Sequence, residues 1–355
     1  MKFSKSYFDD IRYFDEPYKR VLLGIFLVVL FLVPQKLSSY LIFTLNLIGV
    51  YTIMTVGLNI LLGYTGQISL GHAAFMAIGA YTSTVLTAKA GVPFLLALPA
   101  SGFMTAAIGC IVGIPALRLK GLYLALATMS FAFIINVVIV EWPQLTQGSD
   151  GISVPSPAIG PLVLNTDLRK FYLIYSVVIV MLVFAKNILR TRIGRAFVAI
   201  RDSDIAAETM GINLAKYKII AFGVSAFYGG VSGSLFAHLM GFIGPDNFTL
   251  LDSVAYLIMV IVGGTASILG SIMGAAFMTI LPELIRVSKD HFPAILSEQK
   301  GLEAIVYGAI LILFIMFEPT GLYGRWLRIK AYWRAFPLGK KMKRRKLVVS
   351  GARRV

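Results

Sequence analysis

Charged residues are scarce in this chain of 355 residues, because Asp, Glu, Lys and Arg together make up only 14%. Ordinary soluble domains contain about 25% charged residues. Hydrophobic residues make up 57%, and they gather in apolar runs of about 18 or more residues. This composition excludes an ordinary soluble protein and predicts a chain that crosses a membrane several times.

Cysteine is almost absent, since Cys110 is alone, and this excludes an internal disulfide framework. His72 and His238 lack the Glu or second His at helical spacing that a zinc site needs, so we expect no metal site. Each is expected to form a hydrogen bond between helices instead. The chain also lacks the loop GxxxxGK[ST] that holds nucleotide phosphates. We therefore expect no cofactor on this chain and no catalytic residue, and any ATP must bind to another polypeptide.

Acidic residues are missing from the middle of the apolar runs. A charge at the centre of a bilayer costs at least about 3 kcal/mol, so a functional one would stand out. This pattern argues against an enzyme or an ion-coupled pump, although an ion-coupled secondary transporter stays a rival. The acids that touch the runs all lie at an end, namely Glu141, Asp252, Glu283, Glu303 and Glu318.

The apolar runs predict an all-α polytopic membrane protein with about ten transmembrane helices. Residues 1–20 contain four acids among five bases and no small-residue cleavage site, so the first run is expected to be a retained span rather than a signal peptide. The eighth and ninth runs contain several glycines and could instead form one bent or re-entrant element. The runs lie near residues 21–34, 41–62, 68–88, 94–117, 121–141, 171–189, 217–241, 252–263, 267–286 and 302–319.

Basic residues orient these spans, because Lys and Arg accumulate on the cytoplasmic side of short loops. With both termini cytoplasmic, the inner segments hold 26 bases and the outer segments seven. The predicted organisation is a cytoplasmic segment 1–20, a transmembrane domain 21–320 and a basic cytoplasmic tail 321–355. An outer loop 142–170 and a cytoplasmic loop 190–216 interrupt the domain. The net charge of +16 follows from these loops and the tail, and it predicts contact with anionic lipid rather than nucleic acid.

Small residues recur every three or four positions in "GYTGQISLGHAAFMAIGAY", residues 63–81, and predict a central, closely packed helix. Its polar start is either an unwound stretch that exposes backbone to a solute or an ordinary turn between helices. The segment AAFMAI at 73–78 is echoed by AAFMTI at 275–280, which is either an internal repeat or a coincidence. The candidate pathway residues are Gly63, Thr65, Gln67, Ser69, Gly71 and His72.

The cytoplasmic loop contains the unusually acidic segment "RDSDIAAETMGI", residues 201–212. It predicts a short helix capped by Asp202 or Ser203, with Asp204 in its first turn and Gly211 at a left-handed exit. About two turns are too short to be stable alone, so a neighbour must brace this helix unless the segment is a solvated connector. The residues assigned to it are Arg201, Asp202, Asp204, Ala206, Ala207, Glu208, Gly211 and Ile212.

Five separated motifs between about residues 40 and 326 resemble the permease subunits of bacterial branched-chain amino acid ABC transporters, in particular the longer of the two paired permeases. They are "LNILLGYTGQISLGHAAFMAIGAY" at 58–81, "LTQGSDGI" at 145–152, "GRAFVAIRDSDIAAETMGINLAKYKIIAFGVSAFYGGVSGSLFAHLMGFIGP" at 194–245, "GGTASILGSIMGAAFMTILPELIR" at 263–286 and "MFEPTGLYGRW" at 316–326.

The resemblance implies a multi-pass subunit of the bacterial cytoplasmic (inner) membrane that imports leucine, isoleucine and valine. A second homologous permease, two ATPases carrying ATP-Mg, and a periplasmic or lipid-anchored solute-binding protein would be its partners. The same family fold also serves urea and short amides, which keeps those solutes as alternatives.

The resemblance also gives two loops a role. Residues 201–212 correspond to the loop that couples ABC permeases to their ATPases. The outer loop would dock the solute-binding protein, although it could equally be a plain connector. Its candidate docking residues are Gln147, Ser149, Asp150 and Gly151, and Gln147 stands where the family leads us to expect a second glycine.

Overall fold

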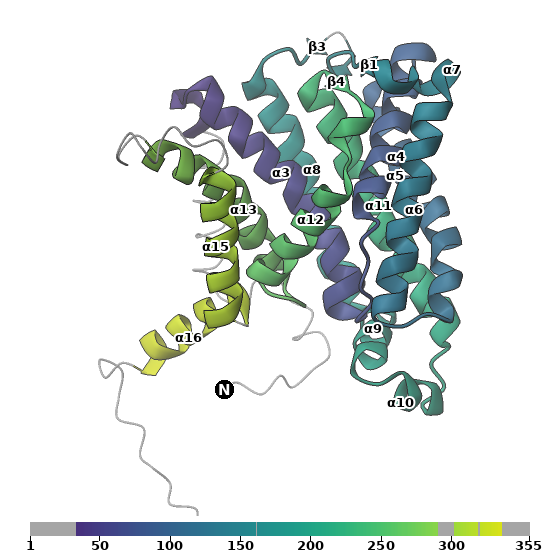
Figure 1. Cartoon of the computed structure of the whole chain (residues 1–355), viewed down its shortest axis with the longest axis vertical. Helices are drawn as coiled ribbons and strands as arrows, with labels where there is room; N and C mark the ends of the chain where they lie inside the picture. Colours follow the sequence, from purple (N-terminus) through teal and green to yellow (C-terminus); the bar gives the residue numbers. More distant parts are fainter. Residues whose placement is uncertain (1–32, 161, 290–301, 319, 336–355) are drawn as a thin grey trace, which may run out of the picture.

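The computed structural model describes residues 33–160, 162–289, 302–318 and 320–335 (Figure 1). The principal helices are α3 (Ser39–Asn59), α4 (His72–Thr84), α5 (Phe94–Gly113), α6 (Leu122–Glu141), α7 (Pro143–Thr146), α8 (Asp167–Arg190), α9 (Arg192–Asp202), α10 (Asp204–Thr209), α11 (Leu214–Met240), α12 (Leu250–Gly263), α13 (Ile268–Lys289), α15 (Leu302–Phe317) and α16 (Gly321–Ala335). The π-helical turns η2 (Ile60–Tyr64) and η3 (Val85–Lys89) extend α3 and α4. Short 3-10 turns lie at Val33–Lys36, Pro115–Leu117, Gly148–Asp150 and Pro245–Asn247.

Strands are confined to two small antiparallel pairs in the described residues. β1 (Ile152–Ser153) pairs with β4 (Phe242–Ile243), so that Ile152 faces Ile243. β2 (Ala158–Ile159) pairs with β3 (Leu162–Val163). The β1–β4 pair ties the loop after α6 to the end of α11.

Seven helices of the described residues are long and apolar enough to cross a membrane, so the chain is a polytopic, predominantly helical membrane protein. They include α3 continued through η2, and α12 preceded by the turn at 245–247. Helix α4, which has 13 residues before its extension η3, and helix α15, which has 16 residues, are not among these seven although spans are predicted there. The predicted span 21–34 lies almost wholly outside the described residues.

The segment 252–286 forms two helices rather than one bent element. α12 ends at Gly263, α13 begins at Ile268, and the two run antiparallel in close contact. A Cβ atom on Gly274 would lie 1.9 Å from the carbonyl oxygen of Met259, so the helix backbones nearly touch. Glycine permits this approach, as small residues do between membrane helices generally.

The most buried helices are α3, α4 and α11, and the expectation that 63–81 contains a central helix is confirmed. α4 and α11 meet through glycines, since a Cβ on Gly79 would lie 2.2 Å from the oxygen of Gly230. A Cβ on Gly233 would lie 1.9 Å from the oxygen of Met76. Dispersion contacts between surfaces this close supply the stability that the hydrophobic effect cannot supply inside lipid.

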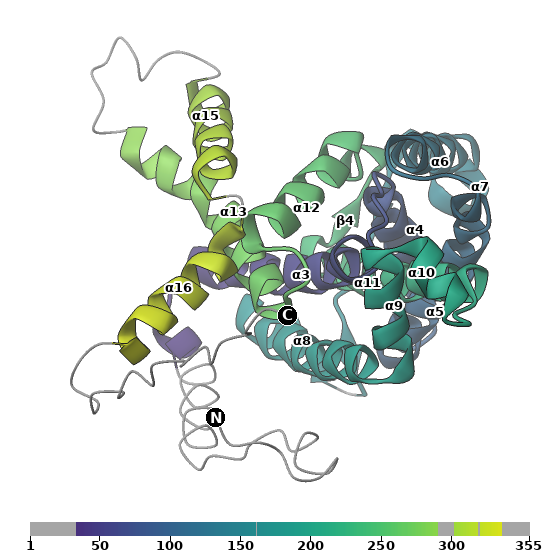
Figure 2. The same cartoon turned by 90° about the horizontal axis from the view of Figure 1, so that it is seen from below.

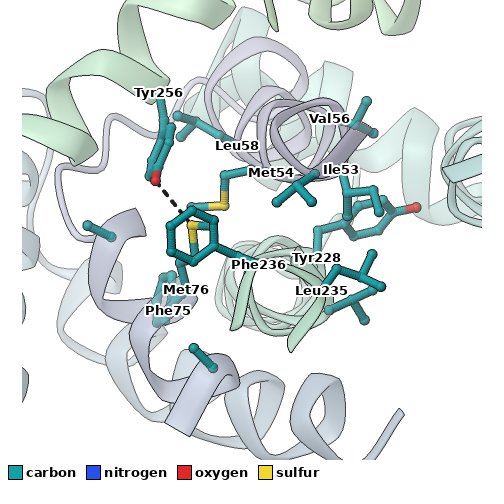
Figure 3. Close-up of a cluster of buried hydrophobic side chains, with 14 of the residues drawn as sticks. Ile53, Met54, Val56, Leu58, Phe75, Met76, Tyr228, Leu235, Phe236 and Tyr256 are labelled. Carbon is teal, nitrogen blue, oxygen red and sulfur yellow. Dashed lines mark hydrogen bonds between the residues drawn. The ribbon is translucent and has the colours of Figure 1, made fainter. Parts of the chain in front are cut away.

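Large apolar side chains fill the space beside these glycine contacts (Figure 3). Met54 of α3, Met76 of α4 and Phe236 of α11 converge there, and Tyr256 of α12 donates a hydrogen bond to the Met76 sulfur over 3.1 Å. Because methionine adapts to irregular gaps, the cluster closes the junction of four helices without large voids.

The bundle has two distinct ends (Figure 1). One end, which we call the loop end, contains α7 and the β pairs, and there the Lys89 ammonium donates to the carbonyl oxygens of Gln144 and Leu145. The other, which we call the α10 end, contains α9 and α10. Figure 2 views the molecule from the α10 end and shows α15 and α16 to one side of the bundle.

Part of the predicted basic tail is helical, because residues 321–335 form α16. The Glu318 carboxylate binds the guanidinium groups of Arg325 and Arg328 at the bend before this helix. Gly321, with a φ of +69°, sits where a Cβ would meet the backbone of Gly264 at 2.7 Å. The tail therefore begins as a helix docked on the α12–α13 turn.

Candidate functional site

The chain unwinds between α3 and α4. The π-helical turn η2 ends at Tyr64, residues 65–71 are non-helical, and α4 begins at His72 (Figure 1). The side chains of Thr65, Gln67 and Ser69 are buried, whereas an ordinary connecting turn would lie on the surface. The structure shows an unwound stretch in which these polar side chains are buried while Gly66 and Ile68 are exposed, and whether its backbone meets a solute stays a prediction.

Side chains from other helices satisfy the backbone of the unwound stretch. The Leu70 amide donates to the Thr128 hydroxyl of α6 over 2.9 Å. The Ala73 amide, in the first turn of α4, donates to the Ser253 hydroxyl of α12 over 2.9 Å. These bonds replace the intrahelical partners that the start of a helix lacks, and they join α6 and α12 to the break.

His72 joins α4 to α11 by hydrogen bonds. Its Nε2 atom lies 2.8 Å from the Ser225 hydroxyl, which donates its own hydrogen to the Gly57 carbonyl, so Nε2 carries the proton. The Nδ1 atom then accepts from the Ser69 hydroxyl at 3.1 Å. Within the described residues no group of three metal-ligating side chains surrounds this ring or His238. The hydrogen bond between helices is the role that the sequence predicted for His72.

α10 is the short helix predicted within residues 201–212. The Ser203 hydroxyl accepts from the Ala206 amide and caps it, whereas Asp202 closes α9. Gly211 has a φ of +81°, and the amides of Gly211 and Ile212 donate to the oxygens of Glu208 and Ala207. This is the Schellman pattern that a left-handed glycine permits.

One side of α10 packs against the protein and the other is bare. Ala207 is buried, while Ala206 and Glu208 are exposed. Ile205 and Met210 are 76% and 84% exposed, which is unusual for apolar side chains on so short a helix. An apolar face of this kind on an amphipathic helix requires a covering partner.

Asp204 fixes α10 to the bundle. Its carboxylate lies 2.7 Å from the Lys120 ammonium and 3.0 Å from the Lys218 ammonium at the start of α11. Partial burial raises the pKa of this carboxyl, but hydrogen bonds and charge attraction from the two lysines outweigh it and lower the pKa below the usual 3.8. Asp204 is therefore ionised at neutral pH and compensates the buried Lys218 cation.

Arg201 joins α9 to the unwound stretch. Its Nη1 atom donates to the Gly63 carbonyl oxygen over 3.2 Å, and its other nitrogens bind the Asp202 carboxylate at 2.8 and 3.0 Å. Gly66, with a φ of +73°, lies against the Arg201 side chain. The structure thus brings together two residue sets for which separate roles were predicted, the candidate pathway and the acidic loop.

Asn59 holds the α12–α13 turn against the end of α3. Its amide nitrogen donates to the Ser267 carbonyl at 2.9 Å and to the Ser271 hydroxyl at 2.7 Å, and its oxygen accepts from the Ala266 amide at 2.8 Å. Ala266 occupies the left-handed region with a φ of +56°. The echoed segments lie in different helices, residues 73–78 in α4 and residues 275–280 in α13, and whether they form an internal repeat stays a prediction.

A cavity of about 310 Å³, which we call the junction cavity, lies where these elements meet. Its walls come from the turn 65–67, the α5–α6 connection, the α9–α10 junction and the start of α11. The lining residues are Thr65, Gly66, Gln67, Ala116, Leu119, Lys120, Gly121, Leu124, Ile200, Arg201, Ser203, Asp204, Ile205 and Lys218.

The candidate docking residues lie at the loop end, far from this junction (Figure 1). Gln147, Ser149 and Asp150 are exposed, whereas Gly151 is buried against Phe242. Gln147 has a φ of +59°, a conformation that glycine adopts more readily, and this explains physically why a glycine is expected there.

Several residues of the junction were not predicted. Lys120 and Lys218 lie far from Asp204 in sequence, so nothing local marks them as its partners. α9 could have been found, because its buried residues Gly194, Ala196, Phe197 and Ile200 follow helical spacing. The contact between the end of α3 and the α12–α13 turn could have been suspected from Asn59, because a polar residue at the end of an apolar run needs hydrogen-bond partners.

Comparison with known proteins identifies the family. The family described as "Branched-chain amino acid transport system / permease component" matches residues 40–315. The chain belongs to this family. The permease is 31% identical over 297 residues to the high-affinity branched-chain amino acid transport system permease protein LivM of Escherichia coli, which covers 77% of this chain and 67% of that protein.

The permease is also 26% identical over 291 residues to the corresponding protein LivH of Escherichia coli, covering 78% of this chain and 91% of that one. Among solved structures, PsaBC from Streptococcus pneumoniae in complex with Fab aligns with a TM-score of 0.42 and 13% identity, over 87% of this chain and 99% of that chain. That score is too low to support a conclusion. The relatives are permease components rather than enzymes, and the permease is a multi-pass membrane protein of a transport system.

Proposed function

We propose that this permease imports leucine, isoleucine and valine as one membrane subunit of an ABC transporter. The observation that carries the proposal is the junction itself, where a braced helix with a bare apolar face is bonded to an unwound segment of the membrane domain. The two relatives carry branched-chain amino acid transport in their names. The absence of ion coupling is supported by burial, because no Asp or Glu whose side-chain burial the structure describes is fully buried.

The partners we propose are a second homologous permease, two ATPases and a periplasmic or lipid-anchored solute-binding protein. ATP-Mg binds to the ATPases, and this chain holds no cofactor. α10 is the coupling helix, and Ile205 and Met210 enter a groove of an ATPase. Its motion reaches the unwound stretch through Arg201 and reaches α11 through Asp204 and Lys218.

The orientation we propose puts the α10 end and both termini in the cytoplasm, in a chain of about ten spans. Its domains are the cytoplasmic segment 1–20, the permease domain 21–320 with loops 142–170 and 190–216, and the tail 321–355, which contacts anionic lipid. The lysines and arginines of the junction at the α10 end support this orientation. The solute-binding protein docks at the loop end, on Gln147, Ser149 and Asp150.

Reconstitution tests this function. The permease, its homologous permease and the ATPases are placed in proteoliposomes, with the binding protein added outside and MgATP inside. We expect uptake of labelled leucine that requires ATP, the ATPases and the binding protein. Uptake without ATPases would contradict the proposal. Uptake of urea or acetamide in preference to leucine would show that the solute is urea or a short amide rather than a branched-chain amino acid.

Cysteine cross-linking tests the coupling helix directly. In a Cys110→Ala background, Ile205→Cys and Met210→Cys should each form cross-links with the ATPase subunit. Ile159→Cys, an exposed apolar position at the loop end, is the matched control and should form none. Cross-links from Ile159→Cys but not from the two α10 positions would reverse the proposed orientation.

A further inference from the structure

The junction cavity contains a buried polar group that no protein group satisfies. Gln67 is only 5% exposed, it lines the cavity, and neither its Nε2 nor its Oε1 atom has a hydrogen-bond partner among the described residues. Leaving a buried amide unpaired is unfavourable, so such groups in a cavity wall point to a ligand that donates and accepts hydrogen bonds.

The charges of the cavity select an anionic group. Lys120, Arg201 and Lys218 line it together with a single acid, Asp204, which gives the lining a net charge of +2. Asp204 compensates the buried Lys218 ammonium, so the excess positive charge comes from Lys120, which is largely exposed, and from Arg201, which is partly exposed. A carboxylate is the group that an amide N–H and a guanidinium bind together.

Another part of the wall is apolar and consists of Ala116, Leu119, Leu124, Ile200 and Ile205. Thr65, Gly66, Gly121 and Ser203 complete the lining. The volume of about 310 Å³ lies at the lower end of the range for small-molecule sites, about 300–1,000 Å³. A small ligand with a carboxylate, a donor for the Gln67 oxygen and an apolar side chain matches all three parts of the wall. A free amino acid with an apolar side chain has this chemistry.

We propose that the junction cavity binds a free apolar amino acid from the α10 end and that the bound molecule slows transport. Its carboxylate faces the Gln67 amide and the basic side chains, its ammonium group faces the Gln67 oxygen, and its side chain contacts the leucines and isoleucines. The turn 65–67 forms one wall, and Ser203, Asp204 and Ile205 of the α9–α10 junction form another. Occupancy therefore holds α10 against the unwound stretch. The slowing rests on the proposed function, in which the α10 end faces the cytoplasm and α10 must move.

Equilibrium binding tests the site without transport. The assembled transporter of both permeases and ATPases, in lipid nanodiscs and without binding protein, is titrated with labelled leucine. We expect saturable binding that Gln67→Leu weakens by about tenfold or more. Gln144→Leu, the same change on exposed α7, is the control and should bind as the wild type does. The proposal would be overturned if leucine binding were not saturable or if the two variants bound leucine equally. It would also be overturned if inorganic phosphate, at the same concentration as leucine, displaced the leucine.

Transport tests the inhibition. In the proteoliposomes, leucine sealed inside should reduce the initial uptake rate, and Leu119→Trp, which fills the cavity, should remove this reduction. A wild-type rate that is independent of internal leucine overturns the inhibition, as does inhibition that survives Leu119→Trp. Failure of the proposed function gives a different result from failure of the inhibition. If the proposed function is wrong, ATP-driven uptake is absent even when no leucine is sealed inside the proteoliposomes. The binding titration can still be read in that case.

Discussion

Arg201 of α9 donates a hydrogen bond to the carbonyl oxygen of Gly63, at the end of the helix that precedes the unwound stretch. Carbonyls at a helix end lack an intrahelical donor, so this guanidinium completes the end of α3 from outside it. The contact spans 138 positions in sequence and links the loop next to α10 with the break in the membrane domain. In the proposed mechanism, motion of α9 and α10 would therefore reach the break through this charged, directional bond.

Arg201→Gln should separate ATP hydrolysis from uptake. Glutamine is too short to reach Gly63, so α10 could still bind the ATPase but would no longer act on the unwound stretch. We expect uptake in proteoliposomes to fall by about tenfold or more while ATP hydrolysis by the assembled complex persists. Arg195→Gln is the same change on the same helix, at a guanidinium that donates to the Arg190 carbonyl oxygen, and this variant should transport normally. Equal losses in both variants would contradict the role of the Gly63 bond.

Gly211→Val should abolish transport without preventing membrane insertion. The space around Gly211 is open, but its φ of +81° is unfavourable for a β-branched residue, so the end of α10 must rearrange. Gly211→Asn is the control, because asparagine tolerates this conformation, and it should retain most uptake. Glu208→Arg, a charge reversal on an exposed side of α10, should also remove uptake. Normal uptake by Gly211→Val and Glu208→Arg would make this segment a connector.

Changes around Asp204 should follow an order set by burial. Asp204→Asn leaves the Lys218 cation uncompensated where its side chain is only 7% exposed, and it should cost about 1–3 kcal/mol of local stability. Lys218→Met should cost less, because Asp204 keeps Lys120. Lys120→Met should cost least, about 0–1 kcal/mol, since that ammonium is largely exposed. Hydrogen exchange of the α10 amides measures this order. Lys216→Met is the control, because this lysine has no ion pair among the described residues, and a reversed order would refute the anchoring role of the buried pair.

The local features of α10 could be predicted from the sequence, and its attachment could not. The Ser203 cap, the first-turn position of Asp204 and the left-handed Gly211 depend on backbone rules that act within a few residues. The contacts with Lys120 and Lys218 depend on how α6 and α11 approach, which no short-range rule specifies. The break before His72 was likewise predicted only as one of two alternatives, because polarity in a turn does not reveal whether protein covers it.

The membrane-spanning helices also divide into those that the sequence predicts well and those that depend on contacts with other helices. Long apolar runs predicted α3, α5, α6, α8 and α11, since length and composition suffice for them. The runs at 68–88 and 252–263 were less informative, because α4 starts later than its apolar run and α12 is short. At the start of α4, the hydroxyls of Thr128 and Ser253 from other helices accept hydrogen bonds from the Leu70 and Ala73 amides. A hydropathy pattern contains no information about such partners.

Asn59 and Ala266 should respond in opposite directions to substitution. Asn59→Leu removes four hydrogen bonds at the α12–α13 turn and leaves buried polar groups unpaired, so we expect a loss of about 2–4 kcal/mol. Ala266→Gly relieves an unfavourable left-handed conformation and should raise stability by up to about 1 kcal/mol. Thermal unfolding in detergent measures both changes. A stabilising Asn59→Leu, or a destabilising Ala266→Gly, would show that other contacts hold this turn.

Two glycines in membrane helices should give contrasting results on substitution by alanine. At Gly79 the new methyl group would lie 2.2 Å from the Gly230 oxygen and 2.4 Å from its Cα, so α4 and α11 would have to separate. Overpacking of this kind costs about 1–3 kcal/mol or more. At Gly308 of α15 nothing lies within 4 Å, and alanine should instead favour the helix by up to about 1 kcal/mol. Gly79→Ala should therefore lower the thermal unfolding temperature in detergent while Gly308→Ala keeps or raises it. Equal tolerance at both positions would mean that α4 and α11 do not meet through their glycines.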